Sequence, residues 1–116
     1  MLTRLVRPLL GSVLHPPPPG PPLPAGVELR VGRWVPALAG RLSGMRRSAA
    51  AVTLGRTIVL HPDVRLDDRL LRHELEHVRQ WRRHPLTFPM RYTLCHIRYG
   101  YHDNPYERAA RDAERG

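Results

Sequence analysis

His73, Glu74 and His77 have the spacing H-E-x-x-H, the pattern in this chain with the clearest chemical meaning. On a helix, two histidines four residues apart lie on the same face and can bind one metal ion. The glutamate beside the first histidine can then act as a general base toward a water molecule on that metal. The pattern predicts a metal-dependent hydrolase, with Zn²⁺ as the expected cofactor and Glu74 as the expected catalytic residue.

The sequence around this motif predicts an amphipathic helix that begins after Asp67, a typical N-cap residue. One side of the helix is polar and consists of Arg69, Arg72, Glu76, Arg79 and Arg83. The other side is apolar, and the three motif residues lie there among Leu70, Leu71, Leu75, Val78 and Trp81. An unpaired buried carboxylate is strongly unfavourable, and a divalent cation would compensate for it. The alternative is a pair of core histidines bonded to the backbone, with Glu74 paired to an arginine.

A catalytic zinc site needs a third protein ligand, and the downstream candidates are His84, His96, His102 and Glu107. The subclass H-E-x-x-H-x-x-G-x-x-H is excluded, because Gln80 and Arg83 occupy its two diagnostic positions. His96 lies in an apolar segment and fits a core residue equally well.

Glu107 has two interpretations that spacing alone leaves open. It follows Asn104 and Pro105, so it can be the third residue of a helix whose N-cap is Asn104. In that capping box, its carboxylate would bind a backbone N–H group instead of a metal.

Three segments resemble, in the same order, a group of small bacterial zincin-like metallopeptidases of the gluzincin type. They are Ala51–Leu60, the run H-E-L-E-H-V-R-Q from His73 to Gln80, and Gly100–Ala110 with its N-P-x-E-x-x-A pattern. The resemblance covers about residues 27–116 and implies that Glu107 is the third zinc ligand beside His73 and His77. One position departs from it: Arg111 stands where better-studied gluzincins have an aspartate that orients a histidine.

The expected fold is α+β, a minimal zincin-like fold with a short antiparallel sheet or edge strand packed on about three helices, the motif helix central. Residues 27–31 alternate like a strand, and residues 50–54 and 56–60 flank Gly55 as a hairpin, a bulge or one bent strand. In zincin-like enzymes the strand before the motif helix, here residues 57–60, is an edge that pairs with extended substrate. A second helix is predicted from Thr87 to Tyr99, ended by Gly100, and a third from Asn104.

The N-terminal residues 1–26 differ in composition and are predicted to be a disordered, proline-rich segment before a single domain of residues 27–116. A short helix or loop is expected at residues 36–44. No apolar run suits a signal peptide or a membrane span, so we expect a cytoplasmic protein, with secretion left open. The single Cys95 excludes an intrachain disulfide.

The formal net charge is +9, and all 19 basic residues are arginine, which reflects codon bias more than selection for nucleic acid. The expected partner is a peptide or protein substrate, with no specific nucleic acid. Tyr101 and His102, just before the Glu107 helix, are the candidates to donate a hydrogen bond to the transition state. Two alternatives stay open: a zinc-binding structural domain without catalysis, and a basic nucleic-acid-binding protein with an incidental motif.

Overall fold

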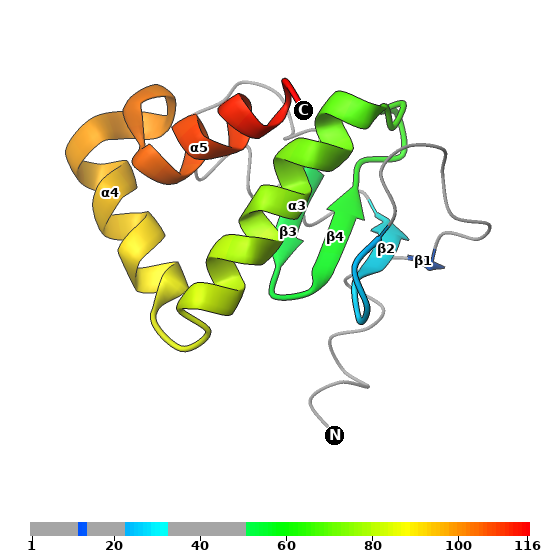
Figure 1. Cartoon of the computed structure of the whole chain (residues 1–116), viewed down its shortest axis with the longest axis horizontal. Coiled ribbons are helices and arrows are strands. Elements are labelled where there is room, and N and C mark those ends of the chain that lie inside the picture. Colours follow the sequence, from blue (N-terminus) through cyan, green and yellow to red (C-terminus); the bar gives the residue numbers. More distant parts are fainter. Residues whose placement is uncertain (1–11, 14–22, 33–50) are drawn as a thin grey trace.

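The computed structural model describes residues 12–13, 23–32 and 51–116 (Figure 1). Most of the predicted proline-rich segment, and the helix or loop expected at residues 36–44, lie outside these ranges. The fold class is α+β, as predicted: a small sheet is packed against helices, and the motif helix is central. Among the described residues, no helix is long and apolar enough to cross a membrane.

The sheet has the strand order β1-β2-β4-β3 and is mixed, where an antiparallel sheet was expected. The strands are β1 (Ser12–Val13), β2 (Glu28–Val31), β3 (Ala51–Leu54) and β4 (Thr57–Leu60). β2 and β4 pair in parallel, while β1–β2 and β3–β4 are antiparallel. Alternation in a sequence identifies strands without identifying their neighbours, so the parallel pair was not predictable from it.

The hairpin around Gly55 is one of the predicted alternatives and is the one observed. Gly55 has a φ of +64°, which a residue without a Cβ adopts at no steric cost in a tight turn. The assignment of residues 57–60 to the sheet edge is wrong, because β4 lies between β2 and β3. Ile58 and Val59 are fully buried, as befits an interior strand. The edge strand beside the motif helix is β3.

Residues 1–26 are not wholly without structure, contrary to the prediction. Ser12 and Val13 pair with Val31 and Arg30. Leu23 packs against the core, so part of this segment gains apolar contacts that composition alone did not indicate.

Helix α3 (Asp68–Arg83) carries the motif and lies between the sheet and helix α5 (Pro105–Ala113) (Figure 1). Asp67 caps α3 as predicted, accepting a hydrogen bond from the Leu70 N–H at 2.8 Å. The core joins three strand residues to three residues of α3: Leu29, Ile58, Leu60, Leu71, Leu75 and Val78. Glu76 was expected in solvent but is buried, because its carboxylate accepts hydrogen bonds from Arg79 and Gln80.

Helix α4 (Phe88–Asp103) connects α3 to α5 and is interrupted where the sequence predicted its end. Gly100 has a φ of +79°, which breaks the regular helix. Asn104 then caps α5: its side-chain oxygen accepts from the Tyr106 N–H at 3.0 Å. The Asn104 amide also donates to the Tyr92 carbonyl at 3.3 Å. This buried side chain therefore fixes the start of α5 against α4.

Candidate metal centre

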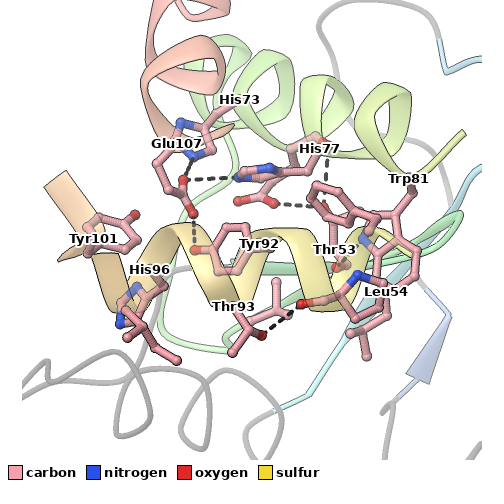
Figure 2. A pocket seen from close by; sticks show the side chains of 16 residues that line it. Thr53, Leu54, His73, His77, Trp81, Tyr92, Thr93, His96, Tyr101 and Glu107 are labelled. Atoms are coloured by element: carbon pink, nitrogen blue, oxygen red, sulfur yellow. Dashed lines mark hydrogen bonds and ion pairs between the residues drawn. The ribbon is translucent and has the colours of Figure 1, made fainter. Parts of the chain in front are cut away.

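Three side chains from two helices converge on one point (Figure 2). The Nε2 atoms of His73 and His77, on α3, lie 3.1 and 3.0 Å from the same oxygen of Glu107, Oε1, on α5. One potential ligand atom from each residue lies within 4.8 Å of the others. The side chains are 12%, 9% and 6% exposed, so the cluster is largely shielded from water. Both ring nitrogens and the carboxylate are ligand types that zinc accepts.

The outer nitrogens of both histidines also have partners. His73 Nδ1 lies 2.9 Å from Glu114 Oε2, and His77 Nδ1 lies 2.8 Å from Gln80 Oε1. A carboxylate oxygen can only accept, so His73 donates through Nδ1. The Gln80 amide nitrogen donates to the Tyr106 carbonyl at 2.9 Å, so its oxygen faces His77 and accepts in the same way. In the neutral form of each ring, the Nε2 lone pair therefore points at Glu107.

The carboxylate of Glu107 divides its two oxygens between different partners. Oε1 faces the histidines, while Oε2 accepts a hydrogen bond from the Tyr92 hydroxyl at 2.6 Å. The capping-box interpretation of Glu107 is wrong in this structure, because its side chain is turned toward α3 and Asn104 supplies the cap. Tyr92 leaves Oε1 as the oxygen available to a metal.

The electrostatics of the cluster follow from this packing. Burial disfavours a charged His77, but the hydrogen bond to Glu107 and the nearby Glu74 outweigh it and raise the pKa of His77 to about 9. The pKa of His73 is raised by the same partners against the effect of burial. Burial would raise the pKa of Glu107, but hydrogen bonds from both histidines lower it well below its ordinary value. Without a metal, this packing favours the anionic form of Glu107 and the protonated forms of the two histidines.

Glu74 is buried beside this cluster, at a cavity of about 520 Å³. Its Oε2 accepts a hydrogen bond from the Thr53 hydroxyl of β3 at 2.7 Å. Residues of β3, α3, α4 and α5 line the cavity, so the cluster of His73, His77 and Glu107 and the edge of the sheet face the same space. Trp81, in the same wall, donates its indole N–H to the Thr53 carbonyl at 3.2 Å.

The two predicted donors to the transition state are in different places. Tyr101 lines the cavity, and burial together with the Glu107 and Glu74 charges raises its pKa to about 12. Its hydroxyl stays protonated at neutral pH and can donate a hydrogen bond. His102 is exposed and outside the cavity lining; its backbone carbonyl accepts from Arg111.

The other two candidate ligands lie outside the cluster. His84 is the C-cap residue of α3. His96 lines the cavity and stacks on Tyr92, with ring centroids 6.3 Å apart. Its Nδ1 is buried and has no partner among the described residues, so it does not behave as a satisfied core histidine.

Sequence reasoning missed four residues that hold the site: Thr53, Gln80, Tyr92 and Glu114. Glu114 had a detectable signal. It lies seven residues after Glu107, which is two helical turns and the same face. It supplies a carboxylate beside His73, the role that an aspartate four residues after the ligand glutamate has in better-studied gluzincins, where this chain has Arg111.

The chain belongs to the eCIS core domain family, whose sequence model matches residues 26–85. The matched segment includes β2, β3, β4 and α3, and it ends before α4 and α5. No curated protein and no solved structure matches the chain.

Proposed function

We propose that this eCIS core domain is a zincin-like, zinc-dependent metallopeptidase, with His73, His77 and Glu107 as the metal ligands. The observation that carries this proposal is the direction of the lone pairs. Both Nδ1 atoms donate outward, to Glu114 and Gln80, so both Nε2 atoms face an oxygen that can only accept. Either two protons or one cation must lie between the two Nε2 atoms and Glu107 Oε1. A single divalent cation would bind all three of these atoms at once.

The size and chemistry of the donor set fit zinc. Ligand atoms around a tetrahedral zinc at about 2.0–2.1 Å lie roughly 3.3 Å apart. The two Nε2–Oε1 distances of 3.1 and 3.0 Å need to open by only a few tenths of an ångström. Hydrogen-bonded Nδ1 atoms are also typical of ligand histidines, because such bonds fix the ring and its tautomer. Bound there, zinc would polarise a substrate carbonyl and lower the pKa of a water molecule toward about 7.

The protein groups around the centre can supply the proton transfers of peptide hydrolysis. Glu74 would take a proton from the attacking water and pass it to the leaving amine as the C–N bond breaks. Thr53 holds Glu74 at Oε2, which leaves Oε1 to carry the proton. Tyr101 would donate a hydrogen bond to the developing oxyanion, since its raised pKa keeps the phenol protonated.

The test compares two carboxyl-to-amide changes on the same helix. Glu74→Gln should keep one zinc per chain but lose about 10²–10⁴-fold in hydrolysis of an unfolded protein, because the amide cannot accept the proton. Glu76→Gln is the matched control: Glu76 is also buried on α3, but it pairs with Arg79 outside the cavity lining. This variant should cleave at nearly the wild-type rate. Metal content is measured by elemental analysis and cleavage by mass spectrometry.

The outcomes separate the proposal from its alternatives. A purified wild-type protein without zinc, and with melting unchanged by added zinc, would end the metal hypothesis. Zinc in the wild-type protein without cleavage of any peptide would leave a zinc-binding structural domain. Equal cleavage by wild type and Glu74→Gln would remove Glu74 from the reaction.

A further inference from the structure

We propose that the cavity beside the metal centre is a subsite for a large apolar side chain of the peptide substrate. This inference rests on the proposed peptidase function and narrows it to peptides with an aromatic or branched aliphatic residue next to the cleaved bond. The cavity contains the metal cluster and Glu74 in its lining, so a side chain inside it belongs to a residue adjacent to the reacting carbonyl.

Aromatic rings form one wall of the cavity. Trp81 and Phe88 pack together with ring centroids 5.2 Å apart. The single polar atom of the Trp81 ring already donates to the Thr53 carbonyl, so the rest of the indole presents hydrocarbon surface. Thr53 lies on the edge strand β3, where a peptide ligand could pair with the backbone. Because its carbonyl already accepts from Trp81, β3 offers one acceptor fewer for such pairing. Side-chain contacts in the cavity are therefore the larger source of selectivity.

The charges around the cavity disfavour acidic ligands. The chain has 19 arginines, yet none of the described residues that line the cavity is basic apart from its histidines. The carboxylates of Glu74 and Glu107 lie at the metal end and would repel an acidic side chain. The arginines of α3 are instead paired on its outer surface, as with Arg79 and Glu76 at 2.9 Å. Phosphorylated or nucleic-acid ligands therefore find no arginine or lysine among the described lining residues.

The rim of the cavity is apolar and exposed in the described structure. Leu54 of β3 is 41% exposed and Ile97 of α4 is 76% exposed, although both line the cavity. A bound apolar side chain would cover part of this surface, and removing apolar surface from water makes the free energy of binding more favourable. A volume of about 520 Å³ also lies within the range of roughly 300–1,000 Å³ for ligand pockets. It suits one large side chain with part of its backbone.

The decisive experiment places a charge at the rim without disturbing the core. Two fluorogenic peptides that differ only in Phe or Asp beside the cleaved bond are compared, and the wild-type protein should prefer Phe by at least about tenfold in kcat/KM. Ile97→Arg should lower this preference at least about tenfold, mainly by losing activity on the Phe peptide. Leu94→Arg is the matched control, since Leu94 is exposed on the same helix but does not line the cavity. It should leave the ratio unchanged.

Binding of labelled Gly-Phe-Gly and Gly-Asp-Gly peptides to zinc-loaded Glu74→Gln, followed by fluorescence anisotropy, gives a second measurement that needs no turnover. Equal cleavage of both peptides by the wild-type protein, or an equal effect of both arginine variants, would overturn the subsite and leave the peptidase standing. Preferential binding of the Phe peptide by Glu74→Gln, together with a wild-type protein that cleaves neither peptide, would support an apolar binding site and count against the peptidase. Equal binding of both peptides would overturn the subsite.

Discussion

The two helices that form the proposed metal centre contribute to it in different ways. Helix α3 supplies both histidines and the proposed general base, Glu74, within five consecutive residues. Helix α5 supplies Glu107, thirty residues after His77, and Glu114, which contacts His73. The family match has the same division, because it includes α3 and ends at residue 85. The residues that α3 contributes are neighbours in the sequence, whereas those from the α5 segment reach the centre only through the packing of α5 against α3.

That packing is carried by polar contacts as well as by apolar burial. Gln80 binds His77 on its own helix and also donates to the Tyr106 carbonyl at the start of α5. Asn104 holds α5 against α4, and Ala110 is fully buried. A ligand on α5 can therefore reach α3 only when the connecting helix α4 and these buried amides are in place.

Removing a ligand from either helix is expected to have the largest effect on the centre. His77→Ala and Glu107→Gln should each lower zinc affinity by more than the roughly 10–100-fold typical of outer hydrogen-bond partners. Both should lose the thermal stabilisation that zinc gives the wild-type protein, since metal binding couples to folding. Helix content in Glu107→Gln should stay nearly constant because Asn104 provides the cap. Competition with a chromogenic chelator and circular dichroism measure these changes.

Unaltered zinc affinity in Glu107→Gln would contradict the role of α5 as the second half of the centre. The third ligand would then be sought at His96, which lines the same cavity. A loss of helix content comparable with the loss of zinc would instead restore the capping interpretation of Glu107.

Smaller effects are expected from the outer partners, one on each helix. Glu114→Ala and Gln80→Met remove the acceptors for His73 and His77, and each should lower zinc affinity about 10–100-fold. Both changes should lower the melting temperature of the metal-free protein, since Glu114 pairs with His73 and Arg69. The decrease should be larger for Gln80→Met, because Gln80 is fully buried and also loses its bond to the Tyr106 carbonyl. Asp112→Ala, an exposed change on α5, is the control and should alter neither quantity. Equal destabilisation by Glu114→Ala and Gln80→Met would contradict the difference between the helices.

The comparison also explains which features were predictable from the sequence. The cap, apolar side and motif of α3 depend on residues a few positions apart, so periodicity was sufficient for them. The contact of Tyr92 with Glu107 joins two helices, and nothing in the apolar pattern of α4 marks that hydroxyl as a partner. The interior position of β4, which was expected at the edge, could have been predicted from the sequence. Its apolar run Ile58–Leu60 is typical of a strand buried on both faces. Glu114 was missed because only the position four residues after Glu107 was considered.

The smallest expected effect is an exchange of protons for zinc. In the metal-free protein His77 has a pKa raised to about 9, so its ring is protonated at pH 7, and the pKa of His73 is raised in the same direction by Glu107, Glu74 and Glu114. Zinc binds only neutral imidazole, and its binding at pH 7 should release about one proton from His77, in addition to any proton that His73 holds. Calorimetry in two buffers of different ionisation enthalpy measures this number, which should fall as the pH rises through about 9.

Zinc affinity should therefore rise with pH, whereas the stability of the metal-free protein should fall. The raised pKa of folded His77 stabilises the metal-free protein fully below about pH 6.5, and this contribution is lost as the pH rises through about 9. The zinc-loaded protein should lack this decline, because its rings carry no exchangeable Nε2 proton. Proton release that is absent at pH 7, or that persists unchanged in Glu107→Gln, would show that Glu107 on α5 does not control the protonation of the histidines on α3.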